Sequence, residues 1–513
     1  MPAVVYVVST LLLRVATSVA AEEIPLHAPI PDDVQEIEIT YSEANRPVVA
    51  FNSNPQRSSR PRLRPPHASF DLLSVLADPV AGSACRREAS TGPGLTINVP
   101  SSTGPAACVI PFKQHALLDL LSYDTLLIEG RASGSVTLTF SGEGPDPSRP
   151  LTELVPLSGT FDLEQPLRRV FSGLDPRHIG HLVLLSDGQP AQVQIATLTV
   201  DQRSSRKPHR SSRGIWVWEY RDVLANPERI LLDCRRFAVS RVLLQLPDLR
   251  DGEDVWEAYG RFVVHAAAAG LEAIALDGDP RAIYDPGPLI EKVQRLVSLL
   301  PLDRPVSIQL DIEPYLLPEF SPPTDYRRYI EALDRVKQAL NDRGRLSVVM
   351  PFWLTEKFLD GRPVAFTVMD RVDEVAVMSY RTDMDEVRAI ADDWLRYGDL
   401  AAKPVWLALE TRPLPVERRL TLIREPREKF VEAYLDRPGH RLILNPADAR
   451  GPRPGWEGFR VAHRITVRPE RLTFAGRQRR EVEAALAVLD RLPFASSAGI
   501  LIHDYTGWLS LAP

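Results

Sequence analysis

Eight apolar runs separated by amphipathic stretches dominate the sequence from residue 214 onward. The runs occupy residues 214–220, 241–248, 271–279, 306–315, 346–353, 374–381, 405–411 and 499–505. Stretches with the apolar spacing of helices, such as residues 288–300 and 325–344, lie between them. Apolar runs without polar alternation are typical of parallel strands that are buried on both faces. The repeats therefore predict an α/β fold, a (β/α)8 TIM barrel over residues 214–513, with residues 412–498 as a long insertion between its seventh and eighth strands.

The preceding part of the chain has a different pattern. Residues 22–201 contain short alternating runs separated by Gly, Pro, Asp and Ser clusters, which predicts an antiparallel β-sandwich. Residues 202–213 are basic and polar, and we expect them to link the sandwich to the barrel. A chain of 513 residues is long enough for this multidomain arrangement.

The N-terminus carries features of an export signal. Residues 4–13 are apolar, and small residues follow up to position 21, which predicts a signal peptide over residues 1–21 and a periplasmic or secreted bacterial protein. No later run is long enough to span a bilayer, so no integral membrane segment is expected in the mature protein. Among the three cysteines, Cys85 and Cys108 could pair in an oxidising compartment, and Cys234 is expected in the core.

Several classes of function find no support in the sequence. The formal charge of −6 and the pI near 6.0 do not indicate nucleic-acid binding, which is typical of basic domains. The sequence lacks CxxC, HExxH and G-x-S-x-G motifs and a Gly-rich phosphate loop, so no metal and no cofactor are predicted. The oligomeric state is left open.

Carboxylates and aromatic residues gather where the predicted barrel strands end. In TIM barrels these carboxyl ends form the catalytic rim. Aromatic rings stack on sugar faces and carboxyl groups cleave glycosidic bonds, so this combination predicts a carbohydrate-processing site. The candidate substrate-binding residues are Trp216, Trp218, Asp277, Tyr315, Trp353, Arg381, His503, Asp504, Tyr505 and Trp508.

Asp311 and Glu313 give the strongest catalytic signal. Because side chains alternate along a strand, the two carboxyl groups should point to the same side. Two neighbouring carboxylates repel each other, which raises one pKa and lets that group act as an acid near neutral pH. A helix N-cap is the alternative role for such residues after a strand.

Residues 311–313, Asp-Ile-Glu, resemble the end of the D-x-x-D-x-D-x-E motif of family 18 glycoside hydrolases, the chitinase-like barrels, and Met378-Ser379-Tyr380 is similar to their M-x-Y motif. This resemblance implies that Glu313 donates the proton, that Asp311 orients the reacting group and that Tyr380 bonds near the anomeric centre. The chain departs from the family pattern at Val306, Gln309, Arg381 and His503.

A second resemblance concerns the positions of two glutamates. Clan A retaining glycosidases carry their acid/base after strand 4 and their nucleophile after strand 7, where this chain has Glu313 and Glu410. The second carboxyl group is therefore Asp311 or Glu410, and an ion pair with Arg381 or Arg412 is the alternative role for Glu410.

The N-terminal domain resembles the galactose-binding-like sandwich of many carbohydrate-binding modules, above all in residues 118–201. All eight Trp residues follow position 213, so this domain has few aromatic candidates for a glycan platform. Packing against the barrel is the alternative role.

Together these features predict an exported, retaining glycoside hydrolase. Its expected partner is a polysaccharide or oligosaccharide substrate, such as an exopolysaccharide or an amino-sugar glycan. Two alternatives stay open: a non-catalytic polysaccharide-binding protein of an export or assembly system, and an interaction protein that docks through the sandwich.

Overall fold

The computed structural model divides into two compact units. Unit 1 comprises Met1–Pro55 and Pro415–Val467, and unit 2 comprises Gln56–Leu414 and Arg468–Pro513. The predicted signal peptide and residues 203–211 of the predicted linker lie outside the described residues, and Ser212 already belongs to a barrel strand. The structure describes residues 22–42, 45–52, 61–88, 94–142, 154–202, 212–341, 343–425, 431–445 and 454–513.

Unit 2 contains a closed barrel of parallel strands in the order predicted from the sequence. The strands are β14 (Ser212–Val217), β15 (Arg241–Gln245), β16 (Glu272–Asp277), β17 (Val306–Leu310), β18 (Gly344–Pro351), β21 (Glu374–Met378), β22 (Val405–Glu410) and β27 (Ser497–His503). Most side chains of these strands are apolar because one face meets the barrel interior and the other meets helices. Leu243, Ile274, Val349 and Leu501 belong to the interior cluster.

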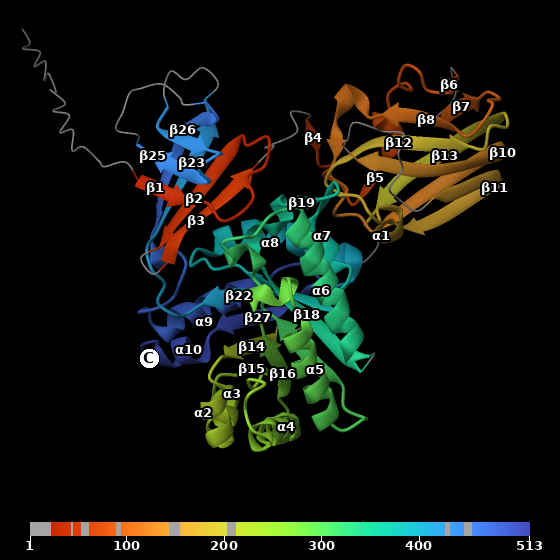
Figure 1. Cartoon of the computed structure of the whole chain (residues 1–513). Helices are drawn as coiled ribbons and strands as arrows, with labels where there is room; N and C mark the ends of the chain where they lie inside the picture. Colours follow the sequence, from red (N-terminus) through yellow and green to blue (C-terminus); the bar gives the residue numbers. More distant parts are fainter. Residues whose placement is uncertain are drawn as a thin grey trace, which may run out of the picture. The chain divides into compact units, whose positions relative to one another are not determined.

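Amphipathic helices follow most of the barrel strands (Figure 1). In α6 the buried Tyr326, Tyr329, Leu333, Val336 and Leu340 recur at helical spacing. Among the described residues, no helix combines the length and the apolar character that crossing a bilayer requires. The helices are α2 (Tyr220–Ala225), α3 (Pro227–Arg236), α4 (Glu253–Ala268), α5 (Gly287–Leu299), α6 (Thr324–Leu340), α7 (Val364–Met369), α8 (Met384–Ala401), α9 (Arg479–Leu489) and α10 (Tyr505–Ser510). Short 3-10 helices are η3 (Pro280–Ile283), η4 (Pro314–Leu316), η5 (Phe352–Glu356) and η6 (Pro469–Arg471), and β19 (Phe358–Leu359) pairs with β20 (Arg362–Pro363).

A ten-stranded β-domain forms the other part of unit 2. Its central strand β10 pairs with β13 through Thr125–Ser133 and with β12 through Val136–Gly142, so β10 is shared by two layers. All of its strand pairs are antiparallel except β4 with β9. The strands are β4 (Arg62–Leu63), β5 (Ser69–Asp71), β6 (Arg86–Arg87), β7 (Leu95–Val99), β8 (Ala106–Pro111), β9 (Leu117–Leu118), β10 (Thr125–Gly142), β11 (Val155–Pro166), β12 (Ile179–Ser186) and β13 (Ala191–Asp201). The short helices are η1 (Leu72–Val75), η2 (Lys113–His115) and α1 (Leu167–Val170).

The first strands of the chain lie in another sheet, which corrects the predicted domain boundaries. The sequence pattern assigned residues 22–201 to one sandwich, but β2 (Glu36–Ser42) pairs with β23 (Glu417–Arg424) of the barrel insertion. Figure 1 shows these red and blue strands side by side. Ile37, Ile39 and Leu422 share an apolar cluster in this sheet. The remaining strands of unit 1 are β1 (Glu22–Pro25), β3 (Asn45–Asn52), β24 (Ala433–Asp436), β25 (Arg441–Leu444) and β26 (Trp456–Val467).

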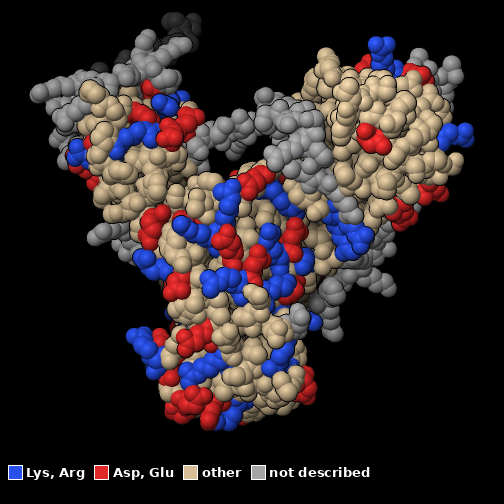
Figure 2. Space-filling view, turned by 45° about the vertical axis from the view of Figure 1, so that its right-hand side comes forward, with Lys and Arg blue, Asp and Glu red and all other residues tan. Residues whose placement is uncertain are grey.

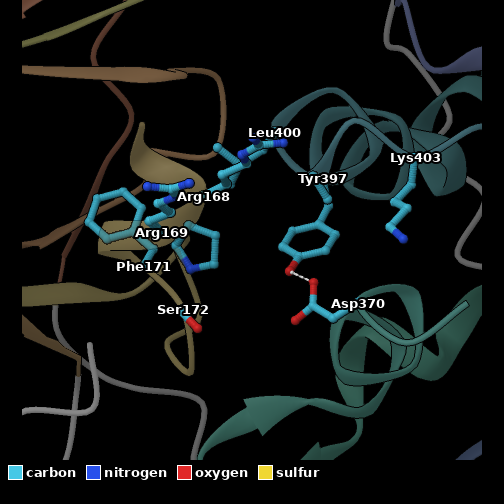
Figure 3. A pocket seen from close by; sticks show the side chains of 10 residues that line it. Arg168, Arg169, Phe171, Ser172, Asp370, Tyr397, Leu400 and Lys403 are labelled. Carbon is cyan, nitrogen blue, oxygen red and sulfur yellow. Dashed lines mark hydrogen bonds between the residues drawn. The ribbon is translucent and has the colours of Figure 1, made fainter. Parts of the chain in front are cut away.

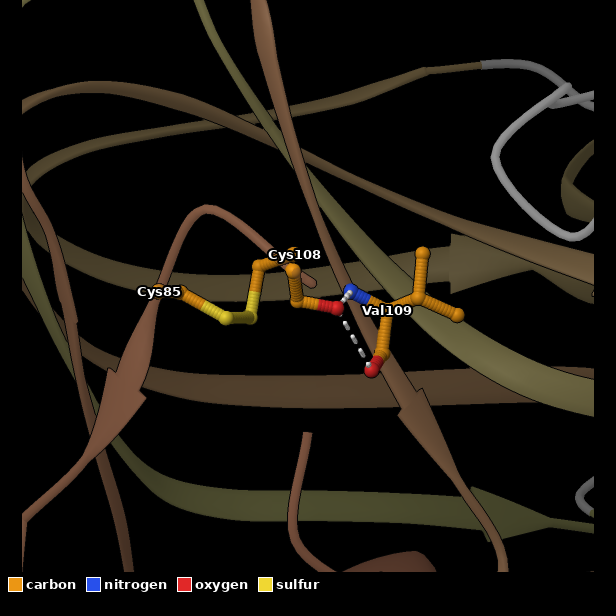
Figure 4. The surroundings of a disulfide bond; sticks show 4 residues. Cys85, Cys108 and Val109 are labelled. Carbon is orange, nitrogen blue, oxygen red and sulfur yellow. Dashed lines mark hydrogen bonds between the residues drawn. A yellow bond between two sulfur atoms is a disulfide. The ribbon is translucent and has the colours of Figure 1, made fainter. Parts of the chain in front are cut away.

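The predicted cysteine pair is present in the β-domain. Cys85 and Cys108 form a disulfide with a Cα–Cα distance of 5.4 Å, which ties the loop before β6 to β8 (Figure 4). Cys234 is free and buried on α3, as the sequence predicts. Desolvation by burial raises the pKa of the Cys234 thiol to about 12, which keeps it protonated and unreactive.

Buried ion pairs join the β-domain to the barrel within unit 2. Arg177, with only 2% of its side chain exposed, bonds Asp175 at 3.0 Å and reaches Asp393 of α8 at 2.6 Å. Arg396 of α8 approaches Asp119 of the β-domain at 3.3 Å. On the face shown in Figure 2, acidic and basic side chains intermingle over the barrel helices, so no continuous basic patch is visible there.

Candidate active site

The predicted carboxyl pair lies directly at the carboxyl end of β17. The backbone N–H of Asp311 donates to the carbonyl of Asp277 at 2.8 Å, which extends the pairing of β16 and β17 by one step. Glu313 follows at the N-cap position of η4, but its side chain makes no capping hydrogen bond there. The N-cap role proposed as an alternative is therefore not the role of Glu313. Gly278 leaves no room for a side chain beside the Asp311 backbone, so this glycine permits the close approach.

Both carboxyl groups hold protons more tightly than they would in water. Burial and the neighbouring Glu313 charge raise the pKa of Asp311 to about 7. Burial also raises the pKa of Glu313, although a hydrogen bond from Tyr315 and the charge of His503 partly oppose that effect. The two groups titrate as a coupled pair. Raised pKa values bring such groups toward the range in which a carboxyl group can act as a general acid.

Aromatic residues surround the pair. The Tyr315 hydroxyl donates to Glu313 Oε1, and the Tyr315 ring contacts Trp353 edge-on with centroids 4.8 Å apart. Burial and the charge of Glu410 raise the pKa of Tyr380 most. The charges of Asp311 and Glu313 add to this effect, so Tyr380 lies close to the pair. Trp353 and Tyr380 are half-buried.

His503 connects the remaining predicted residues. Its Nδ1 lies 2.7 Å from Glu410 Oε2, and its Nε2 accepts a hydrogen bond of 3.1 Å from the indole N–H of Trp218. Since an indole N–H can only donate, this geometry places the imidazole proton on Nδ1, facing Glu410. Burial by itself would lower the pKa of His503, but Glu410 raises it overall. The His503 ring also stacks on Tyr380 with centroids 5.9 Å apart.

Glu410 is engaged on both oxygens. Oε1 accepts the backbone N–H of Arg412 at 2.7 Å, Oε2 bonds His503, and only 1% of the residue is exposed. The alternative role for Glu410, an ion pair with the side chain of Arg381 or Arg412, is not the one found, because its oxygens bond the His503 ring and the Arg412 backbone N–H. A carboxylate with both oxygens occupied positions His503 and is not free to attack an anomeric carbon.

Several buried carboxylate oxygens lack a hydrogen-bond partner among the described residues. Three of them follow barrel strands at the carboxyl end: Glu219 Oε2, Asp311 Oδ1 and Asp504 Oδ2. Arg412 lies 3.4 Å from Asp504 and 3.7 Å from Glu219 and partly balances their charge. Unsatisfied buried acceptors cost free energy. Hydroxyl or amide donors of a bound ligand would satisfy them.

Two predicted tryptophans do not line a cleft. Trp216 is only 1% exposed inside the barrel, where its indole donates to Gln309 at 2.5 Å. Trp508 is 2% exposed, and its ring packs against that of Phe237 with the ring centroids 5.6 Å apart. A ring must be accessible to stack on a sugar, so both assignments as cleft walls are wrong. Trp218 and Trp353 are half-buried and remain candidates.

Four of the residues predicted to bind substrate through polar groups make contacts with other residues of the protein. Asp277 bonds Lys292 at 2.7 Å, and Arg381 reaches Glu386 at 3.3 Å. The Tyr505 hydroxyl donates to Asp233 of α3 at 2.7 Å, and Asp504 caps α10 by accepting from the Gly507 N–H. Sequence reasoning missed Lys292, Glu386 and the bridging role of Arg412. Only Arg412, two residues after Glu410, offered a local signal.

In the part of the chain that the structure describes, we find no metal-binding cluster, that is, no group of three or more His, Cys, Asp or Glu side chains that could hold a metal ion. The site is therefore a cluster of carboxyl groups, aromatic rings and one imidazole. Such a cluster can transfer protons and can accept hydrogen bonds from a polar ligand.

Comparison with known proteins gives weak structural likenesses. No protein-family model matches the chain, and no curated protein matches it by sequence. A class V chitinase of Pseudomonas fluorescens Pf-5 is 15% identical, covering 59% of this chain and 98% of its own, with a TM-score of 0.33. A chitinase of Bacteroides thetaiotaomicron is 10% identical, covering 58% and 90%, with a TM-score of 0.30. A Clostridium thermocellum family 30 carbohydrate-binding module is 17% identical, covering 27% and 91%, with a TM-score of 0.20. TM-scores this low establish neither a shared fold nor a shared activity.

Proposed function

We propose that this protein is a glycoside hydrolase in which Glu313 is the proton donor. The observation that carries the proposal is the coupled pair at the carboxyl end of β17, where burial raises the pKa of both carboxyl groups and the Glu313 charge raises that of Asp311 further. A glycosidic oxygen is a poor leaving group until it is protonated, so hydrolysis needs such an acid. The catalytic rim of a parallel barrel is the expected place for it.

Asp311, rather than Glu410, is the second carboxyl group of the proposed mechanism. Glu410 has both oxygens occupied, whereas Asp311 Oδ1 is buried without a hydrogen-bond partner. A retaining reaction without a free carboxylate nucleophile can use the substrate itself, as substrate-assisted glycosidases do. This favours an amino-sugar glycan with an N-acetyl group beside the scissile bond.

The proposed reaction then has two balanced steps. Glu313 protonates the glycosidic oxygen while the acetamido carbonyl oxygen attacks the anomeric carbon, and the bond to the leaving sugar breaks. Asp311 accepts the amide N–H, and the Tyr380 hydroxyl donates to the acetamido oxygen. Glu313, now ionised, removes a proton from water as that water opens the oxazolinium ring, which restores the acetamido group with retained configuration.

We further propose that the protein is exported to the periplasm or beyond. The Cys85–Cys108 disulfide supports this proposal, since such bonds persist in oxidising compartments and are rare in the cytosol. Mass spectrometry of the natural protein should then find Glu22 as the first residue. A cytoplasmic protein that retains residues 1–21 would overturn this part of the proposal.

The test compares matched glutamate variants on amino-sugar polysaccharides. Glu313→Gln should lower the release of reducing ends by about 10²- to 10⁴-fold, because it removes the acid without changing the shape of the side chain. Glu331→Gln, the same change on the exposed face of α6, should have no effect. Wild-type turnover by Glu313→Gln would contradict the assignment.

A non-catalytic polysaccharide-binding protein is the second candidate. The oxygens Glu219 Oε2 and Asp311 Oδ1, which have no hydrogen-bond partner among the described residues, favour a polar ligand whether or not a bond is cleaved. This candidate predicts that the wild-type protein binds glycan and releases no reducing ends. It also predicts that Glu313→Gln leaves glycan affinity unchanged.

A further inference from the structure

A cavity of about 310 Å³ lies within unit 2 at the junction of the β-domain and the barrel (Figure 3). Arg168 and Arg169 of α1 form one wall, and Tyr397 of α8 and Lys403 lie across from them. Lys403 lies two residues before the start of β22, so the cavity lies near the amino ends of the barrel strands. The carboxyl pair lies at the opposite ends of the strands, and the two sites are distinct.

Uncompensated positive charge lines this cavity. Within the described part of the chain, neither Arg168 nor Arg169 has a hydrogen-bond or ion-pair partner, and both are exposed. Lys403 is half-buried and donates to the carbonyl of Val372 at 2.6 Å, which leaves two of its three N–H groups for a ligand. Burial lowers the pKa of Lys403, and the charges of Asp373 and Asp370 oppose that effect only in part.

The acidic residue of the cavity is already neutralised. Asp370 pairs with Arg362 at 2.5 Å and accepts a hydrogen bond of 2.6 Å from the Tyr397 hydroxyl. Arg362 itself is largely buried behind the lining. The lining therefore presents three cations against one paired carboxylate, and its net potential attracts anions.

The cavity is also built on rigid parts. The Tyr397 ring stacks on Phe366 with centroids 4.0 Å apart, and the buried Arg177 and Arg396 ion pairs hold α8 to the β-domain. Walls that are fixed before binding reduce the ordering cost of a ligand. A volume of about 310 Å³ is close to the lower limit of small-molecule sites, which suits a single sugar unit.

We propose that this cavity binds a carboxylate- or phosphate-bearing ligand of monosaccharide size, with Arg168 and Arg169 as its main anion donors. Guanidinium groups match both oxyanions because their N–H groups form a planar fork. Ser172 adds a hydroxyl to the lining that can bond a sugar hydroxyl. The inference does not depend on the proposed hydrolase activity.

Calorimetric titration of the full-length protein tests the inference. The probes are D-glucuronate, inorganic phosphate and neutral D-glucose, all at one ionic strength set with sodium chloride. We expect at least one anion to bind in the millimolar range and glucose not to bind. Binding of glucuronate alone would identify an acidic sugar as the ligand, and binding of phosphate alone would identify a phosphate group.

The double variant Arg168→Ala/Arg169→Ala locates the binding. It should lower the affinity for the anion by at least about tenfold. A tenfold change corresponds to about 1.4 kcal/mol, and a hydrogen bond to a charged group contributes at least that much. Arg131→Ala, at an exposed position on β10, is the matched control and should bind as wild type does. Equal affinity of the wild type and the double variant, or no binding of either anion to the wild type, would overturn the inference.

Discussion

At the scale of single residues, the site depends on how each carboxyl group is compensated. Glu410 is satisfied by an N–H and an imidazole, and Asp277 is satisfied by Lys292. Asp311 has no cationic partner of this kind and faces the Glu313 charge instead. Compensated carboxylates hold the structure, whereas the uncompensated pair is the one that can exchange a proton near neutral pH.

The raised pKa of Asp311 predicts a pH-dependent stability. A carboxyl group whose folded pKa lies above its unfolded value stabilises the fold fully at low pH, and that contribution is lost as pH rises through about 7. Asp311→Asn removes the buried charge, so it should raise the free energy of unfolding at pH 8 by on the order of 2 kcal/mol, and by much less at pH 5. Urea unfolding at both pH values measures this, and an equal change at both would show that Asp311 titrates normally.

The sequence could place Asp311 and Glu313 near each other because both come from one short segment, although β17 ends at Leu310 and strand alternation does not describe that segment. The sequence could not predict the hydrogen-bond partners of Glu410, because His503 lies on another strand. The sequence also did not predict which single side chains are buried. Trp216 and Trp218 are two residues apart, yet one is inside the barrel and the other reaches the rim.

At the scale of elements, the pattern predicted the eight barrel strands because each is a largely apolar run and most are followed by an amphipathic helix. Alternation also predicted β2 and β3 as strands, but their assignment to the sandwich was wrong. An alternating run predicts a strand but not its neighbour, and the neighbour β23 lies in the insertion near the other end of the sequence. Pairing between distant segments has no local signal.

The pairing of β2 with β23 predicts that a core change near the N-terminus destabilises the insertion. Ile37 is fully buried in the shared cluster, so Ile37→Ala should cost about 2–5 kcal/mol. Val48→Ala, at a residue 41% exposed on β3, should cost much less. Hydrogen exchange of the β23 and β26 amides should accelerate only in Ile37→Ala, and unchanged exchange there would contradict the assigned unit.

At the scale of the whole molecule, unit 2 is held together by buried charge as well as by apolar packing. Although burial alone would raise the pKa of Asp175, hydrogen bonds from His178 and Arg177 and the Arg177 charge hold it well below its usual range. The pair therefore stabilises the junction above the unfolded pKa of Asp, about 3.9, and that stabilisation is lost as pH falls.

Arg177→Ala should leave Asp175 buried without its main cation. We expect a loss of about 3–5 kcal/mol at pH 7, because an uncompensated buried charge is costly. The loss should shrink toward pH 4 as Asp175 takes up a proton, whereas Arg131→Ala should change stability little at either pH. Chemical unfolding at the two pH values measures both variants, and a loss that does not depend on pH would show that packing, not charge, joins the two parts.

The central claim is that Glu313 and Asp311 carry the chemistry while Glu410 only positions His503. The most direct measurement is kcat of Glu313→Gln and Glu410→Gln on an N-acetylated glycan and on its de-N-acetylated counterpart. We predict turnover of the acetylated glycan alone, a loss of about 10²- to 10⁴-fold in Glu313→Gln, and a loss of no more than about a hundredfold in Glu410→Gln. Equal turnover of both glycans, together with a loss in Glu410→Gln as large as that in Glu313→Gln, would contradict the account and would make Glu410 the nucleophile.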